Sequence, residues 1–320
     1  MTTASRNQPE GETMKKLYKI HPDAAAALAQ NDASPVLLYA FDGFIDSGIA
    51  AGLAIGDLVS QPDSQRLVSF NTDELVDYRS RRPPMAFSAE GWSGYHEPQL
   101  GIDLVHDADG SPFLLMYGTE PDSRWEAFTD AVIEVVETFD VRLAVGMHGM
   151  PSGAPHTREW KVTGPGNASE LVERIAGRSD ATLQLPGSAM ALTEYKLREV
   201  GRDAHTFVVH VPHYLTQMPS PIATAKLMKE VGAATGLNFD LSRLQEGANV
   251  QREQIDQQIA EQPELADAIK KMEDEYDRRP TAGTVELPAG PLPNGDQLAA
   301  EFEQFLASQN GDNQAGPFTD

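Results

Sequence analysis

Short apolar runs alternate with amphipathic stretches along most of this chain, which is the pattern of strands alternating with helices. The runs predict buried strands at 35–41, 66–70, 141–145 and 206–211. The amphipathic stretches predict helices at 49–58, from 123 to 139, at 192–200 and at 223–234. This alternation is typical of an α/β domain with a mainly parallel, helix-covered sheet.

Local signals refine these elements. An Asp-Gly turn at Asp109 predicts one antiparallel hairpin, with strands at 103–107 and 112–117. Ser123 with Glu126, and Asn167 with Glu170, resemble capping boxes that open helices. A further, weaker strand is predicted at 182–185. Gly201 is placed to end the helix at 192–200.

The pattern divides the chain into four parts. We expect a flexible N-terminus over 1–16, an α/β domain over 17–237, a helical extension over 238–308 with a Pro/Gly-rich linker at 281–295, and a disordered tail at 309–320. In the extension, Pro263 starts a helix with Leu265, Ile269, Met272 and Tyr276 along one stripe.

Composition excludes several classes of protein. The formal net charge is −23, which opposes binding to nucleic acid and to anionic membranes. No apolar run is long enough to span a membrane, and no signal-peptide core is visible. The chain contains no cysteine, so thiolate metal sites are excluded and a cytoplasmic location is expected.

Glycines, prolines and histidines crowd the segment from Gly146 to Arg158, directly after the strand at 141–145. Similar loops follow three other strands, at 42–48, 118–122 and 212–217. The carboxyl ends of parallel strands meet at one edge of a sheet, where ligands usually bind. The candidate site residues on these four loops are Asp42, Asp46, Glu120, Asp122, His148, His156, Arg158 and His213.

Ordinary structural roles compete with this interpretation. Asp46 and Asp122 stand where helix N-caps are expected, and Asp42 precedes a glycine as turn residues do. His148 and His156 do not have the spacing of a metal site, so no metal is expected. Glu120, His156 and Arg158 are least well explained by local structure and are therefore the catalytic candidates, if any catalysis takes place.

Motif searches give no cofactor. The chain has no GxxxxGK[ST] phosphate loop, no GxGxxG after a strand, no HExxH and no GxSxG elbow. Nucleotide binding or serine hydrolysis would therefore rest on analogy of fold alone.

Five separated motifs together resemble the proteasome assembly chaperone 2 family, most closely its actinobacterial branch. They lie at 41–51, 78–83, 118–125, 149–158 and 212–214, in the order expected of one domain. The resemblance implies a three-layer α/β/α domain related to nucleoside-phosphorylase-like folds. It also implies self-association and relatives that assist proteasome assembly. Relatives that dock on proteasomes share a C-terminal tail with tyrosine in the penultimate position. This chain has Thr319 there, before Asp320, so direct docking of this kind is not expected.

Two functions remain open at this point. The first is a non-enzymatic protein-interaction or assembly-chaperone role. Its partners would be other copies of the chain, in a homo-oligomer that we expect to be a trimer, and also other proteins. The second is an enzyme (a hydrolase, phosphorylase or ligase) that uses the cleft at the carboxyl ends of the strands.

Overall fold

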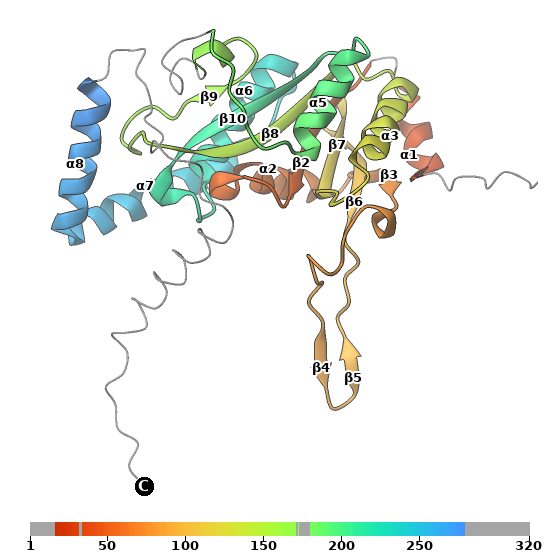
Figure 1. Ribbon diagram of the computed structural model, residues 1–320, viewed down its shortest axis with the longest axis horizontal. Helices are drawn as coiled ribbons and strands as arrows, with labels where there is room; N and C mark the ends of the chain where they lie inside the picture. The colour runs from red at the N-terminus through yellow and green to blue at the C-terminus, as the bar shows by residue number, and fades with distance from the viewer. Residues whose placement is uncertain (1–16, 32–33, 171, 173–179, 279–320) are drawn as a thin grey trace, which may run out of the picture.

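One large mixed sheet organises the protein in the computed structural model, which describes residues 17–31, 34–170, 172 and 180–278 (Figure 1). The expected flexible N-terminus, the linker at 281–295 and the tail at 309–320 lie outside the described residues. The strands of the sheet, in chain order, are β1 (Tyr18–Ile20), β2 (Val36–Asp42), β3 (Gln65–Phe70), β6 (Leu100–His106), β7 (Pro112–Thr119), β8 (Leu143–Ser152), β9 (Val162–Thr163) and β10 (Ala204–Pro212).

Four neighbouring strands at the centre of the sheet are parallel. The spatial order is β1-β3-β6-β7-β2-β8-β10-β9, and β7, β2, β8 and β10 run in the same direction. The predicted hairpin is confirmed as β6 and β7, and antiparallel pairing continues through β3 and β1 on one side and β9 on the other. The mainly parallel core with antiparallel margins agrees with the predicted fold class.

Helices cover both faces of the sheet, which gives the three layers. The helices are α1 (Pro22–Leu28), α2 (Ala50–Val59), α3 (Trp125–Thr138), α5 (Ala189–Glu199), α6 (Pro221–Thr235), α7 (Ser242–Glu261) and α8 (Pro263–Arg278). The first face carries α1, α3 and α5, and the second carries α2, α6 and α7. Short 3-10 turns are η1 (Ser47–Ile49), η2 (Thr72–Glu74) and η3 (His213–Leu215).

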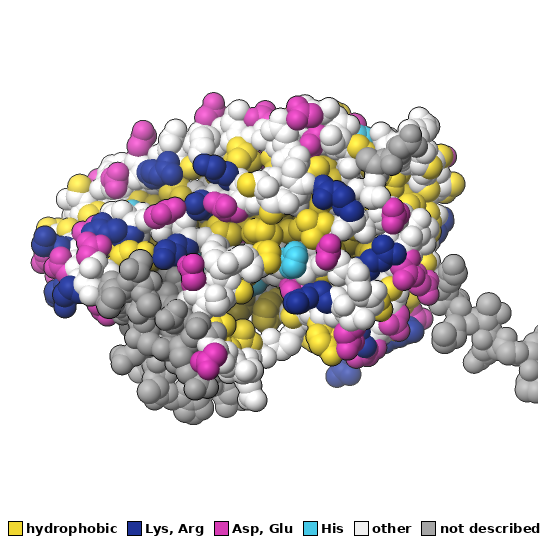
Figure 2. Space-filling model, turned by 90° about the horizontal axis from the view of Figure 1, so that it is seen from above, with side chains coloured by type: hydrophobic (Ala, Val, Ile, Leu, Met, Phe, Trp, Pro, Cys, Tyr) yellow, Lys and Arg dark blue, Asp and Glu magenta, His cyan; other side chains and the backbone are white. Residues whose placement is uncertain are grey.

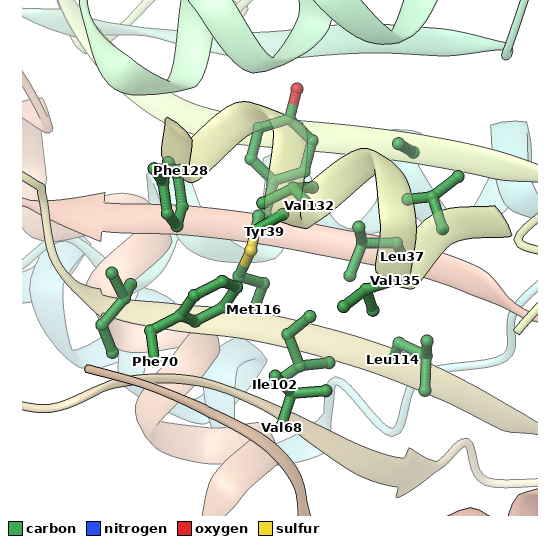
Figure 3. Packing of buried hydrophobic residues seen from close by; sticks show 14 of the residues in the cluster. Leu37, Tyr39, Val68, Phe70, Ile102, Leu114, Met116, Phe128, Val132 and Val135 are labelled. Carbon is green, nitrogen blue, oxygen red and sulfur yellow. The ribbon is translucent and has the colours of Figure 1, made fainter. Parts of the chain in front are cut away.

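The core under α3 shows how the apolar pattern is used. Phe128 and Val132 of α3 pack on Tyr39 and Met116 of the central strands, and all four side chains are fully buried (Figure 3). Phe70 packs 5.1 Å from Phe128, measured between ring centroids. Burial of large apolar and aromatic side chains stabilises such a core by about 2 kcal/mol each.

Two local predictions are wrong. Residues 182–185 form no strand, and Leu185 is 72% exposed. The outer edge of β10 is paired with β9. Ser123 does not cap α3. Its hydroxyl donates to the carbonyl of Leu75, and Arg124 occupies the N-cap position in a left-handed conformation. The helix after Asn167 lies largely outside the described residues.

A two-stranded hairpin projects from the body beside the β3 and β6 end of the sheet (Figure 1). Its strands are β4 (Ala86–Ser88) and β5 (Gly91–Ser93), which pair antiparallel. We call residues 82–98 the arm. At the opposite end of the sheet, α7 leads to α8, which stands at the margin of the molecule (Figure 1).

Charges of both signs are spread over the surface. Seen from above, hydrophobic side chains gather in the middle of the face, and lysine, arginine and acidic side chains are interspersed around them (Figure 2). No continuous basic stripe crosses this face. None of the described helices combines the length and the apolar character needed to span a lipid bilayer.

Candidate functional site

The four predicted loops do meet at one edge of the sheet, which we call the carboxyl edge. The amide of Glu120 donates to the carbonyl of Asp42 at 2.9 Å, which joins the loops after β7 and β2. The amide of Gly48 donates to the carbonyl of Thr216 at 2.8 Å, which joins the loops after β2 and β10. The parallel order of β7, β2, β8 and β10 is the reason for this convergence.

The glycine-rich segment differs from its prediction, because the strand does not end at Val145. β8 continues to Ser152 and stays paired with β10 as far as Pro212. Position 149 of this strand requires glycine, because a Cβ there would stand 2.1 Å from the carbonyl oxygen of Ser47. Glycine in a strand thus marks close approach of another backbone and does not mark an exit from the sheet.

Asp46 caps α2 and ties the helix to β8. Its carboxylate accepts hydrogen bonds from the amides of Ala51 and Gly52, at 3.1 and 3.0 Å. It also accepts the amide of Gly149 at 2.8 Å. The N-terminus of a helix after a parallel strand is the place where folds of this kind bind phosphate. Here the Asp46 carboxylate occupies that position, so the chain fills its own anion site.

Glu120 performs a similar task for α5. Its side chain is buried, and Oε1 accepts the amide of Ala189 at 2.8 Å, the first residue of that helix. Ser188 caps the same helix by accepting the amide of Ala191. Glu120 therefore lies where the dipole of α5 stabilises its negative charge.

Arg81 links the arm to this edge. Its guanidinium donates to the carbonyl of Asp42 at 3.1 Å and pairs with Asp122 at 3.0 Å, across Gly43. Asp122 also accepts the amide of Asp77 at 2.8 Å. Partial burial and the nearby Asp46 raise the pKa of Asp42, and Arg81 opposes that shift.

The second point where the arm joins the body, at Gln99, is fixed as well. The amide of Thr119 donates to the carbonyl of Gln99 at 2.8 Å, and Gly118 allows that contact with a φ of 128°. One end of the arm is therefore bonded to the end of β7 and the other to the loops after β2 and β7, so the base of the arm is held at the carboxyl edge.

His156 pairs with Tyr214 of η3. The Tyr214 hydroxyl accepts the amide of His156 at 2.8 Å and lies 2.7 Å from Nδ1 of the ring. Nε2 is buried without a hydrogen-bond partner among the described residues. Burial lowers the pKa of His156, and the carboxylates of Asp256 and Glu273 oppose the shift.

Arg158 connects the same loop to α8. Its Nε and Nη2 donate to the two carboxylate oxygens of Asp277 at 2.8 and 2.5 Å, and Nη1 lies 3.3 Å from Glu273. The two-pronged geometry is the strong form of an arginine–carboxylate pair. It raises the pKa of Arg158 and lowers that of Asp277.

The remaining histidines differ in exposure. Burial lowers the pKa of His148, whose ring lies 3.3 Å from the carbonyl of Gly149. His213 is exposed and stacks edge-on against Tyr214, with 5.3 Å between ring centroids. Neither histidine approaches a group of carboxylates. Within the described part of the chain, no group of three or more histidines and acidic residues is arranged to hold a metal ion.

The three catalytic candidates have separate partners: Glu120 binds α5, His156 binds Tyr214 and Arg158 binds α8. No hydrogen bond or ion pair joins Glu120 to the other two in the described structure. A cavity of about 450 Å³ lies elsewhere, between the end of α2, the β6–β7 turn and the α6–α7 connection, and none of the eight predicted residues lines it.

Sequence reasoning missed two polar residues, Tyr214 and Arg81, and the exposed aromatic side chains of the arm. Tyr214 stands beside a histidine after a strand, and Arg81 lies in an arginine-rich stretch. The sequence therefore marks both positions, but it does not show which residues they contact. On the arm, Phe87 and Trp92 are 71% and 68% exposed and pack on each other at 4.9 Å between ring centroids.

Comparison with known proteins shows one family. The model of the PAC2 family matches residues 40–259. Among curated proteins no match was found. A Corynebacterium glutamicum protein of unknown function has a similar structure, with 33% identity and a TM-score of 0.73, over 82% of this chain and 97% of that one. A Mycobacterium tuberculosis protein of unknown function gives the same identity and TM-score, over 94% and 96%.

A third solved structure carries a functional description. It is a proteasome-assembly chaperone homologue from Mycobacterium tuberculosis, which is 27% identical over 72% of this chain and 98% of that one, with a TM-score of 0.62.

Proposed function

The chain belongs to the PAC2 family, and on that premise we propose that it is a homo-oligomeric protein-interaction factor of the assembly-chaperone kind. In this proposal the partners are other copies of the chain and further proteins, and the site of action is the cytoplasm. The absence of cysteine suits such a reducing compartment.

The exposed aromatic pair on the arm is the observation that carries this proposal. Met85 and Tyr95 add to the pair, with 45% and 51% of their surfaces exposed. Large aromatic side chains are the residues that contribute most to protein interfaces. Phe87 and Trp92 lie outside the core of their own subunit, and a partner that covers them would remove their apolar surface from water.

The carboxyl edge supports an interaction role over catalysis. Asp46 and Glu120 serve as helix caps, and Arg158 holds α8. Each carboxylate is directed at backbone amides of its own chain, so these groups orient the loops instead of facing a common reacting atom. We therefore propose that the loops and the arm form a surface for protein partners.

We propose a trimer as the oligomer. The arm is fixed at both roots and extends from one end of the sheet, so it can reach a neighbouring subunit without refolding. When such contacts repeat with a rotation that closes, the subunits form a ring, and the proposed trimer is a ring of this kind.

Co-purification of two differently tagged copies tests the proposal. We expect an untagged wild-type copy to be retained by a tagged wild-type copy. When both copies carry Phe87→Ser and Trp92→Ser, the tagged copy should no longer retain the untagged one. Leu185→Ser is the matched control, because Leu185 is 72% exposed and is not part of the arm. Retention of the double variant at the wild-type level would refute a role for the arm.

A further inference from the structure

The cavity of about 450 Å³ lies at the edge of the sheet opposite to the carboxyl edge, where the parallel strands begin. It is bordered by the last turns of α2, the turn between β6 and β7, and the segment that leads from α6 into α7. Clefts of about 300–1,000 Å³ that combine apolar walls with a few polar groups are typical of sites for small molecules. The cavity shares no lining residue with the four loops of the carboxyl edge or with the arm.

Part of the cavity wall is apolar. Leu58 of α2 and Met228 of α6 line it, and both are buried in the core on the second face of the sheet. Phe239 adds an aromatic ring, which packs edge-on against Phe113 of β7 at 5.9 Å between ring centroids. The core holds these side chains in place, so an apolar surface is preformed for the body of a ligand.

The charged part of the lining is mainly acidic, with Asp57, Asp107 and Asp240 against a single basic residue, Arg243. Two of the carboxylates serve their own segments. Asp107 accepts backbone amides of its turn, and Asp240 accepts the hydroxyl of Ser242 at 2.6 Å. For the carboxylate of Asp57, the described structure shows one partner, Nη1 of Arg243 at 3.2 Å from Oδ1.

The ion pair of Arg243 with Asp57 marks the position where a cation fits. The side chain of Asp57 is only 24% exposed, whereas that of Arg243 is 80% exposed. Ion pairs with so exposed a partner contribute little to stability, so another cation can replace the arginine at small cost. In addition, α2 has no basic residue in its last turn, and the negative end of its dipole therefore favours a cation here.

We infer that this cavity binds a small organic cation, a guanidinium or amine carried on an apolar body. Asp57 pairs with the cationic group, and Leu58, Met228 and Phe239 contact the body. Arg243 occupies the same carboxylate without the ligand and moves aside when the ligand binds. This inference goes beyond the proposed function and is independent of it, because it involves neither the arm nor the association of subunits.

Calorimetric titration of the full chain with hexylguanidine tests the inference, and we expect saturable binding. Hexylurea has nearly the same shape without the charge, and it should bind at least about tenfold more weakly because it forms no charge-assisted hydrogen bond with a carboxylate. Methylguanidine keeps the charge without the apolar body and should also lose at least about tenfold. Failure of hexylguanidine to bind, or equal affinities for hexylguanidine and hexylurea, would overturn the inference.

Two substitutions should change the affinity for hexylguanidine in opposite directions. Asp57→Asn keeps the size of the side chain and removes its charge, so the affinity should fall at least about tenfold. Arg243→Gln removes the competing guanidinium, so the affinity should rise about two- to fivefold. Arg252→Gln is the matched control, because it makes the same change of charge at an exposed residue of α7 that does not line the cavity.

The variants also separate the site from a general attraction of cations to this acidic chain. An unchanged affinity in Asp57→Asn would overturn the inference, and so would an equal rise in Arg243→Gln and Arg252→Gln. If Asp57→Asn does not fold, the comparison of the two arginine variants decides, since both positions are exposed. A rise confined to Arg243→Gln supports the cavity as the site.

Discussion

The amide of Gly149 donates to the carboxylate of Asp46 at 2.8 Å and thereby joins β8 to the loop after β2, across 103 residues of the chain. The same carboxylate caps α2, so one side chain fixes the helix, the loop after β2 and the middle of β8. The absence of a side chain at Gly149 is what allows the backbone of Ser47 to come this close.

Gly149→Ala is therefore expected to destabilise the fold. The new Cβ would lie 2.1 Å from the carbonyl oxygen of Ser47, which is backbone and cannot swing away. Overpacking of this kind costs about 1–3 kcal/mol in the free energy of unfolding. Gly153→Ala is the control, because nothing lies within 4 Å of the position that its Cβ would take, and it should change stability by less than about 0.5 kcal/mol. Equal urea midpoints for the two variants would contradict this account of Gly149.

Substitutions of Glu120 distinguish a helix cap from a catalytic group. Glu120→Ala leaves the buried amide of Ala189 without its acceptor and should cost about 2 kcal/mol of stability. Glu120→Gln keeps a side-chain oxygen at that amide and should retain most of the stability. Urea unfolding measures both variants. An unchanged stability of Glu120→Ala would remove the capping role and return this carboxylate to the list of catalytic candidates.

Acidification is expected to loosen the loop at His156. The folded protein holds the pKa of His156 below its ordinary value of 6.5, so the unfolded chain binds the proton more tightly. Stability from the neutral ring is therefore complete above about pH 7 and declines as the pH falls through 6.5 toward the lower folded pKa. The ring is hydrogen-bonded to Tyr214, and the carboxylates of Asp256 and Glu273 interact with it electrostatically.

The non-titrating variant His156→Gln should show a shallower loss of stability between about pH 7 and pH 5 than the wild type. His148 also has a lowered pKa, so His148→Gln serves as the comparison for the part that does not come from His156. Urea midpoints measured across this range give both slopes. A slope that is as steep in His156→Gln as in the wild type would contradict the role of the neutral ring.

The sheet and the edge where the loops meet could be predicted from sequence, because they depend on local periodicity and on chain order. The strands at 206–211 and 112–117 are examples, since their apolar runs admit few alternatives. The partner of Glu120 could not be predicted in this way. Its hydrogen bond to Ala189 spans 69 residues and exists only after α5 packs beside β7.

The arm escaped the sequence analysis for a related reason. Its strands are three residues each, and the aromatic side chains at Phe87 and Trp92 resemble those of a core strand when only the pattern is considered. Their exposure follows from the projection of the arm, which depends on how residues 71–81 and Gln99 attach to the loop after β7. A local pattern carries no information on that attachment.

The mass of the protein in solution tests the central claim most directly. Light scattering of the full chain at micromolar concentration should give about three times the chain mass of 34.8 kDa for the wild type and for Leu185→Ser. The Phe87→Ser, Trp92→Ser variant should give the mass of a single chain while keeping a cooperative unfolding transition. A wild type that has the mass of one chain, or an arm variant that keeps the wild-type mass, would contradict the account.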